Sequence, residues 1–357
     1  MKVRLVRFCF GIYLMLFITS CKDQSGGPVN NTYWTRFTKS SVPKLLDDNI
    51  HSIYISLKGE VWFGTDSGAC SYRKGGSWSI LPADSFNYYL YHPTRIAREV
   101  KAITESNNGG SIWFGLNGGG IVRWILSASQ NSSGKASIRY LQDKFITGIA
   151  ALTNGDVYTS TTDGASRYIF NLNPDPSFDG EWRAISDLST KVNCVVVNQK
   201  NEWVYFGTDD LIKYYEKGSS SGNTHQISQG YRSPIISMAV QYDLNTLWCG
   251  KQSGVTSYNP GLNIESHYTT LNTDGKLPEG SINAVMTDFY GSTVWFGTNV
   301  GLVQLKGTVW KIFTQSEIPE LPSDIIQALS FDIITKNLWI GTNKGIAVYN
   351  ENGIKGL

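Results

Sequence analysis

Val294-Trp295-Phe296-Gly297-Thr298 is one of seven copies of a short phrase that recurs along this chain. Each copy carries an aromatic residue in second place, and the other six are Val61-Trp62-Phe63-Gly64-Thr65, Ile112-Trp113-Phe114-Gly115-Leu116, Val157-Tyr158-Thr159-Ser160-Thr161, Val204-Tyr205-Phe206-Gly207-Thr208, Leu247-Trp248-Cys249-Gly250-Lys251 and Leu338-Trp339-Ile340-Gly341-Thr342. From aromatic to aromatic, the steps are 51, 45, 47, 43, 47 and 44 residues. A period in the forties made of short strand-like segments indicates a β-propeller.

One repeat predicts four strands. An apolar run, a polar turn, the aromatic phrase, a tight turn with Gly and a second apolar run follow one another, and a further segment often carries Trp, as at Trp78, Trp182 and Trp310. The Gly after the aromatic is expected to let backbones approach closely. The third repeat departs most, because Tyr158 and Ser160 replace Trp and Gly. We therefore expect an all-β, seven-bladed propeller with four-stranded blades.

The two ends of the repeat region predict how the ring closes. The last repeat finishes at Val348-Tyr349-Asn350 without a fourth strand. An orphan segment before the first repeat, Tyr33-Trp34-Thr35-Arg36-Phe37-Thr38, resembles the fourth strand Val309-Trp310-Lys311-Ile312-Phe313-Thr314. We expect this segment to complete the last blade, with Trp34 in the same blade as Trp339. Closure of this kind removes open sheet edges.

The N-terminal residues predict an extracytoplasmic address. A basic start and the short apolar stretch Phe8–Ile18 lead to Ile18-Thr19-Ser20-Cys21, which has small residues before a Cys. This pattern predicts a lipoprotein signal peptide over 1–20, lipidation of Cys21, a flexible tether over 21–31 and a single propeller over 32–357. An ordinary secretory signal with a chance Cys is the alternative.

The expected partner of the lipid is the membrane, in the cell envelope. Lys22-Asp23 resembles the short signal that sends some Gram-negative lipoproteins to the outer cell surface. We expect an outer-membrane lipoprotein, either periplasmic or surface-exposed.

The charge balance argues against nucleic acid as a partner. Without residues 1–20 the chain keeps 28 Lys and Arg against 29 Asp and Glu, which leaves no electrostatic footprint for nucleic acid. Apart from Cys21, the chain after residue 20 has three cysteines, Cys70, Cys194 and Cys249, which fall in separate repeats without CxxC spacing, so we expect buried apolar side chains and neither a disulfide nor a metal site.

The sixth and seventh repeats resemble a known repeat family. Val294-Trp295-Phe296-Gly297-Thr298-Asn299-Val300-Gly301-Leu302, together with the preceding Asp274–Val285 and the similar Leu321–Ala328, is similar to the two-component regulator propeller repeat. In that family, tandem propellers form the periplasmic sensing half of hybrid histidine kinases, many of which detect polysaccharide breakdown products. The resemblance implies the fold and a sensing role. This chain departs from that plan, with one ring and no kinase, so we expect it not to signal by itself.

The sequence offers little catalytic chemistry. Its four histidines, His51, His92, His225 and His267, fall in different repeats, and no acid, base and nucleophile are grouped. Acids such as Asp66 stand in tight turns, where Asp is favoured by its bonds to nearby backbone. Asn171–Asp175 loosely resembles a calcium loop, but Pro176 replaces the required Gly. We expect no cofactor and no metal.

The best candidate site is the long connection Leu81–Glu99 together with His51, which could face the central channel. It carries flat aromatic rings and basic groups that suit sugar rings or a protein partner, namely Tyr88, Tyr89, Tyr91, His92, Arg95 and Arg98. A self-packed surface loop is the alternative.

These observations predict a non-catalytic binding propeller, for a glycan or for a partner protein in a surface complex. The alternative is a propeller lyase or hydrolase acting on polysaccharide at the channel mouth, with His51 and neighbouring acids. A structural component of an envelope assembly without a small ligand is the third possibility.

Overall fold

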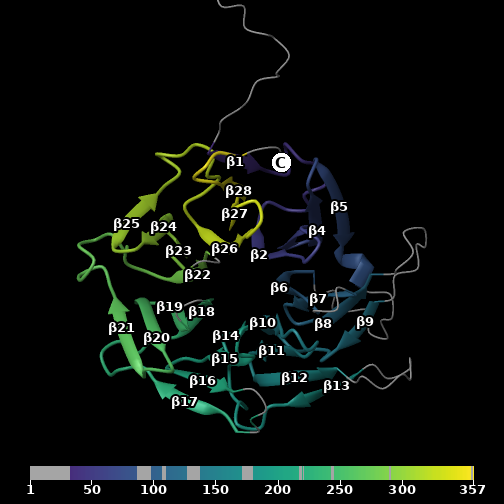
Figure 1. Ribbon diagram of the computed structural model, residues 1–357. Helices are drawn as coiled ribbons and strands as arrows, with labels where there is room; N and C mark the ends of the chain where they lie inside the picture. Colours follow the sequence, from purple (N-terminus) through teal and green to yellow (C-terminus); the bar gives the residue numbers. More distant parts are fainter. Residues whose placement is uncertain are drawn as a thin grey trace, which may run out of the picture. The chain divides into compact units, whose positions relative to one another are not determined.

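The structure is a computed structural model that describes residues 33–86, 98–106, 110–126, 137–170, 180–216, 219, 221–242, 245–288, 291–354 and 357. The chain divides into two units, Met1–Asn31 and Thr32–Leu357, and every described residue belongs to the second. This second unit is built from seven four-stranded antiparallel sheets arranged as blades around one axis (Figure 1). The predicted all-β, seven-bladed propeller is therefore confirmed.

The first four blades follow the order of the chain. Blade 1 consists of β2 (Ile50–Ile55), β3 (Val61–Thr65), β4 (Gly68–Arg73) and β5 (Ser77–Pro82). Blade 2 consists of β6 (Val100–Glu105), β7 (Ser111–Leu116), β8 (Gly120–Ile125) and β9 (Ser137–Tyr140). Blade 3 consists of β10 (Ile146–Ala151), β11 (Val157–Thr161), β12 (Gly164–Phe170) and β13 (Gly180–Ala184). Blade 4 consists of β14 (Cys194–Asn198), β15 (Trp203–Gly207), β16 (Leu211–Tyr215) and β17 (Asn223–Gln226).

The remaining blades complete the ring. Blade 5 consists of β18 (Ile235–Gln241), β19 (Thr246–Lys251), β20 (Gly254–Asn259) and β21 (Ile264–Tyr268). Blade 6 consists of β22 (Ile282–Thr287), β23 (Thr293–Thr298), β24 (Leu302–Lys306) and β25 (Val309–Phe313). Blade 7 consists of β26 (Ile326–Phe331), β27 (Leu338–Thr342), β28 (Gly345–Tyr349) and β1 (Trp34–Phe37). Within the described ranges the helical content is the 3-10 turn η1 (Ala83–Phe86), and no helix there could cross a membrane.

The N-terminal strand closes the ring, as predicted. β1 pairs antiparallel with β28, with Trp34 opposite Tyr349. Trp34 and Trp339 lie in the same blade but in different core clusters. The Trp34 ring lies 5.5 Å from Phe313 of blade 6, and the Trp339 ring lies 5.6 Å from Phe63 of blade 1. The last blade thus contacts the blade before it and the first blade of the chain.

The aromatic in second place of each phrase packs against the next blade. Ring centroids lie 5.6 Å apart for Trp62 and Phe114, and 5.9 Å apart for Trp248 and Phe296. Such tilted aromatic pairs bury large apolar areas between sheets that share no hydrogen-bond ladder. The repeated aromatic therefore joins blade to blade rather than strand to strand.

The Gly in fourth place lets neighbouring blades approach. A Cβ added at Gly297 would lie 2.7 Å from Cγ2 of Ile326, the first residue of the next inner strand, and Gly341 faces Ile50 at the same distance. No real Cβ contact is that short, so the predicted close approach is confirmed. Blade 3 moves its glycine: Ser160 stands in the phrase, and Gly148 lies opposite it on the paired strand.

The inner strands carry a second shared feature, a bulge near their first residue. The pairing register shifts between the first and third residues of β2, β6, β10, β18, β22 and β26. A bulge inserts one unpaired residue and redirects its side chain. The bulged residues are His51, Lys101, Thr147, Ile236, Asn283 and Gln327.

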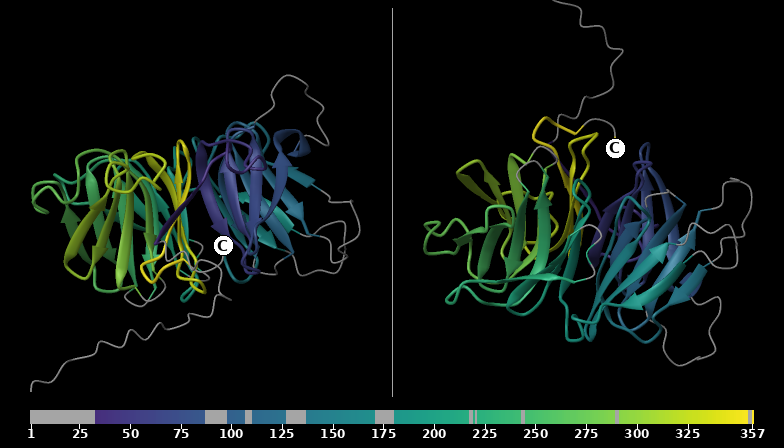
Figure 2. Two further views of the ribbon diagram at one scale, coloured as in Figure 1. Left: turned by 90° about the horizontal axis from the view of Figure 1, so that it is seen from above. Right: turned by 60° about the horizontal axis from the view of Figure 1, so that its bottom comes forward.

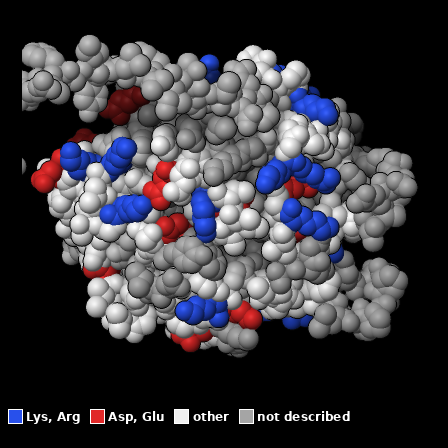
Figure 3. All heavy atoms as spheres, turned by 45° about the horizontal axis from the view of Figure 1, so that its top comes forward, with Lys and Arg blue, Asp and Glu red and all other residues white. Residues whose placement is uncertain are grey.

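We call the face at this end of the inner strands the turn face. It is defined by the turns between second and third strands, such as Asp66–Ser67, and by the connections between blades, such as 98–99. Figure 2 shows the strands running between this face and the opposite one. On the side drawn in Figure 3, acidic and basic side chains are interspersed, in keeping with their near-equal numbers.

Replacing Gly297 by Ser tests the contact between blades. We expect Gly297→Ser to destabilise the fold by about 1–3 kcal/mol, because the new side chain overlaps Ile326. The double variant Gly297→Ser with Ala284→Gly copies the arrangement of blade 3 and should recover part of the loss, because Ala284 lies opposite Gly297. Urea unfolding gives both values. A single variant as stable as the wild type, or a double variant without recovery, would contradict this account.

Candidate functional site

A polar cluster lies on the turn face where blade 1 meets blade 2. Nε2 of His51, the bulged residue of β2, lies 2.5 Å from Oδ1 of Asp66 and 3.1 Å from Oε1 of Glu99. Asp66 belongs to the turn between β3 and β4, and Glu99 directly precedes β6. Lys101, the bulged residue of β6, forms an ion pair with Glu99. We call these four residues the His51 cluster.

Both ring nitrogens of His51 are engaged. Nζ of Lys101 lies 3.4 Å from Nδ1, and because an ammonium group can only donate, Nδ1 accepts. Nε2 then carries the proton and donates to Asp66. In this arrangement His51 has no free lone pair with which to remove a proton from a substrate, and a general base needs one. In this tautomer His51 is therefore placed to hold its neighbours rather than to act as a general base.

Asparagine side chains hold the second oxygen of each carboxylate. Nδ2 of Asn49 donates to Oδ2 of Asp66 at 2.9 Å, and Nδ2 of Asn117 donates to Oε2 of Glu99. Burial alone would raise the pKa of both carboxyl groups. Hydrogen bonds from His51 and Asn49 outweigh it at Asp66, and those from Lys101 and Asn117 outweigh it at Glu99, so both pKa values are lowered. Both groups are therefore negatively charged at neutral pH.

The cluster is accessible from one side. The His51 side chain is only 10% exposed, whereas the Asp66 carboxylate side chain is 45% exposed and Lys101 is 35% exposed. A ligand could thus contact Asp66, Glu99 and Lys101 while His51 holds them from below. The sequence singled out His51 but not this set, because the partners come from a turn and from the next blade.

Most of the predicted binding residues in the connection fall outside the described residues, namely Tyr88, Tyr89, Tyr91, His92 and Arg95. Arg98 is described and exposed, next to Glu99. Both described ends of the connection lie on the turn face: the Ala83 amide donates to Ser67 O at 3.1 Å, and the Asn117 amide donates to Glu99 O at 3.1 Å. The connection therefore begins and ends beside the His51 cluster.

Other blades repeat the pairing in reduced form. Asn193 donates to Asp209 at 3.0 Å in blade 4, and Asn283 donates to Asn299 at 2.8 Å in blade 6. In each case a residue at the start of the inner strand holds a residue of the turn. Blade 1 differs because its inner-strand residue is His and because Glu99 joins from the next blade.

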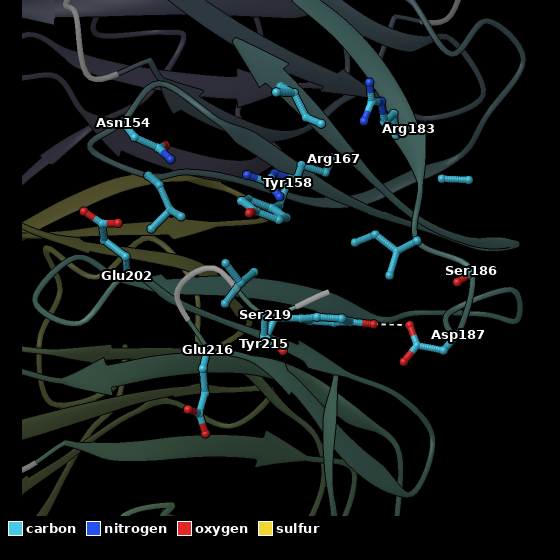
Figure 4. Close-up of a pocket in the computed structure, with 15 residues that line it drawn as sticks. Asn154, Tyr158, Arg167, Arg183, Ser186, Asp187, Glu202, Tyr215, Glu216 and Ser219 are labelled. Carbon is cyan, nitrogen blue, oxygen red and sulfur yellow. Dashed lines mark hydrogen bonds between the residues drawn. The ribbon is translucent and has the colours of Figure 1, made fainter. Parts of the chain in front are cut away.

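A groove runs along the boundary of blades 3 and 4 (Figure 4). Its volume is about 580 Å³, and Tyr158 lines it where most other blades place Trp. Figure 4 shows Arg167 beside Tyr158, and the Tyr215 hydroxyl directed at Asp187, to which it donates a hydrogen bond. Arg167 is already paired with the buried Asp156. The groove is therefore polar, but its Arg167 and Asp187 already have partners within the protein.

A second histidine cluster joins blades 4 and 5, and sequence reasoning missed it. The Glu265 carboxylate on β21 accepts from His225 of β17 at 2.7 Å and from His267 at 2.9 Å. His225 stacks on Tyr258 with ring centroids 3.7 Å apart, and His267 stacks on Tyr231 at 3.8 Å. The two histidines are 42 positions apart in sequence, close to one repeat, and that spacing was the available signal.

Burial and hydrogen bonds shift the pKa values of the titratable groups in this second cluster. Burial alone would raise the pKa of Glu265, but hydrogen bonds from Ser228 and His225 lower it to about 2. Burial lowers the pKa of His267 despite the nearby carboxylate. Lys251, almost fully buried, donates to the Tyr231 carbonyl, and burial lowers the pKa of its ammonium. The cluster is packed between blades, which is typical of a structural role.

Acid should weaken this inter-blade cluster. The folded-state pKa of Glu265 lies below its unfolded value, so its stabilisation is complete above about pH 4.5 and is lost as pH falls toward 2. We expect Glu265→Gln to lower the free energy of unfolding at pH 7 by roughly 1–3 kcal/mol and to flatten its decline between those pH values. Urea unfolding at several pH values measures both. The matched control is Glu351→Gln, which removes an exposed carboxylate paired with Lys306. Parallel pH profiles for Glu265→Gln and the wild type would refute this assignment.

Comparisons with known proteins support the fold alone. No protein-family model matches the chain, and no curated protein matches its sequence. Among solved structures, the extracellular domain of a hybrid two-component system from B. thetaiotaomicron is similar, with a TM-score of 0.63 and 16% identity over 85% of this chain and 38% of that chain. PorZ, a surface component of the type-IX secretion system of Porphyromonas gingivalis, has a TM-score of 0.64 and 14% identity over 85% of this chain and 46% of that one.

A third similar structure is a catalytically inactive virginiamycin B lyase from Staphylococcus aureus, with quinupristin. It has a TM-score of 0.66 and 15% identity, and the match covers 89% of this chain and 98% of the lyase. In contrast, this chain spans less than half the length of the two-component and secretion-system structures that it matches. At these identities the likeness establishes a shared propeller architecture and leaves function to be argued from the site.

Proposed function

We propose that this chain is a non-catalytic, extracytoplasmic propeller that binds a glycan or a partner protein on its turn face. The observation that carries the proposal is the His51 cluster, in which charged groups are accessible while both imidazole nitrogens of His51 are engaged. Fixed, half-exposed polar groups of this kind orient a ligand by hydrogen bonds.

The connection between blades 1 and 2 supports a glycan as the ligand. Its described ends lie beside the His51 cluster, and its sequence supplies Tyr88, Tyr89 and Tyr91. Aromatic rings stack on the apolar faces of sugar rings, while carboxylate, amide and ammonium groups bond the hydroxyls. A protein partner would use the same tyrosines as interface anchors.

The address of the protein is proposed on separate grounds. The N-terminal pattern ending in Cys21 supports an envelope lipoprotein, and the structures of similar fold include domains described as extracellular or as a bacterial surface component.

The tyrosines provide the direct test of ligand binding. We expect the chain without its leader, residues 22–357, to show a hit on a glycan array and a rise in Tm that grows with concentration of that glycan. Replacing Tyr88, Tyr89 and Tyr91 together by Ala should abolish the hit and leave the Tm without ligand nearly unchanged. The control replaces Leu262 and Ile264, two exposed side chains of blade 5, by Ala.

Two results would count against a glycan-binding site. Unaltered affinity in the triple tyrosine variant would remove the connection from the site. Glycan cleavage that is lost in His51→Ala would replace the binding proposal by the enzymatic one. A blank array would instead direct the search to a protein partner, by crosslinking the lipidated chain in membranes.

Membrane attachment has its own test. In a Gram-negative host that makes the chain with its leader, we expect the wild type in the membrane fraction and Cys21→Ser in the soluble fraction, because the thiol is the proposed lipid attachment point. Fractionation with labelled fatty acid measures both. Membrane retention of an unlabelled Cys21→Ser variant would exclude this anchor.

A further inference from the structure

We propose that Asn49, His51, Asp66 and Glu99 form a binding site for a divalent transition-metal ion on the turn face. The metal site lies at the same place as the ligand site proposed above, and the metal proposal holds whichever ligand binds there. Three groups already offer one donor atom each, and these atoms all lie within 4.8 Å of one another. The set is Nε2 of His51 with one oxygen each of Asp66 and Glu99.

The first argument is convergence on one nitrogen. Oxygens of Asp66 and Glu99 both approach Nε2 of His51, at 2.5 Å and 3.1 Å. A neutral ring has one N–H at that position and can donate at full strength to only one carboxylate. If the ring proton moves from Nε2 to Nδ1 as Lys101 withdraws, a cation placed between the three atoms would instead be bound by the Nε2 lone pair and by both carboxylates. One proton therefore cannot serve both carboxylates at full strength, whereas one cation can.

The second argument is an amide oxygen without a partner. Oδ1 of Asn49 is buried and accepts no hydrogen bond, while Nδ2 lies 2.9 Å from Oδ2 of Asp66 and 3.4 Å from Nε2 of His51. The two ends of an amide have nearly the same shape, so the side chain can turn over. The turned amide would place an oxygen against a carboxylate, which is unfavourable without a cation and provides a fourth ligand with one.

The surrounding residues complete the site. Asn117 bonds the second oxygen of Glu99, an outer contact of the kind that orients metal ligands. Lys101 pairs with Glu99 and lies near Nδ1 of His51, so it supplies the positive charge when no metal is bound. Because Lys101 is partly exposed, its ammonium group can move into solvent when a metal ion enters.

The donor set selects the class of metal. An imidazole nitrogen with carboxylate and amide oxygens suits zinc and its neighbours, whereas magnesium and calcium favour oxygen alone. Ligands about 2.0–2.2 Å from a tetrahedral zinc ion lie roughly 3.4 Å apart. The exposed Asp66 turn therefore needs to retreat by less than about 1 Å from His51 to accept zinc.

The other blades offer a built-in comparison. The equivalent pairs Asn193–Asp209 and Asn283–Asn299 lack both the histidine and a second carboxylate. Asp209 is thus a matched control, being a turn acid held by an asparagine on the same face. No metal-ligand spacing predicted the site from sequence, because its ligands come from two blades.

Calorimetry with zinc chloride tests the proposal, on residues 22–357 first treated with a chelator. We expect saturable binding of one zinc ion per chain, weakened about tenfold or more by His51→Ala and by Asp66→Asn. Lys101→Met should bind zinc several-fold more tightly, because it removes the competing charge. Asp209→Asn should bind like the wild type. Calcium chloride should give no comparable signal.

Two further measurements identify the metal ligands and separate loss of the metal site from loss of folding. Visible absorption of bound cobalt(II) should report a nitrogen- and oxygen-liganded site, and this band should disappear in His51→Ala. Thermal unfolding in chelator shows whether each variant is folded, and His51→Gln replaces His51→Ala if it is not. Binding that survives in the folded His51 variant, or no saturable binding in both the wild type and Lys101→Met, would overturn the site. Either result leaves the glycan test unaffected.

Discussion

The contact between a glycine of one blade and the first residue of the next inner strand sets the geometry of this ring. Gly115, Gly297 and Gly341 leave no room for a Cβ beside Ile146, Ile326 and Ile50. Because the blades share no hydrogen-bond ladder with each other, their spacing depends on such side-chain contacts. The aromatic two places earlier packs on the same neighbouring blade, as Trp62 does on Phe114. Where blade 3 lacks the phrase glycine, Gly148 on the paired strand supplies the missing space.

That spacing also positions the candidate site. Each bulged residue directly follows the inner-strand residue that packs against the glycine of the preceding blade. Its side chain is therefore directed to the edge of the turn face. In blade 6 this residue bonds both its own turn and the next inner strand, because Asn283 donates to Asn299 at 2.8 Å and to the Ile326 carbonyl at 3.0 Å. At blade 1 the same position holds His51, and the next blade contributes Glu99 and Lys101. The bulge, which recurs around the ring, thereby contributes to a charged and accessible cluster at blade 1.

Histidine positions illustrate how far sequence reasoning reached. His51 was identified because it follows a polar turn at the start of a strand, and the structure places it at the rim. His225 and His267 were dismissed because they belong to different repeats, yet both bond Glu265 across a blade boundary. Residues one repeat apart lie at similar heights on neighbouring blades, so a propeller brings side chains together that are distant in sequence. The repeat period could therefore have predicted the proximity of the His225 and His267 positions as well.

The repeats alone were enough to predict the number of blades, their four strands and the closing of the ring by Trp34 and its neighbours. They were enough because each repeat carries the local pattern of strands and turns, and because the unpaired ends complement each other. Only the tertiary structure decided which polar groups meet, since His51, Asp66 and Glu99 lie on three different segments with no fixed spacing. Contacts between blades depend on how neighbouring sheets pack against one another, and that packing exists only in the folded ring.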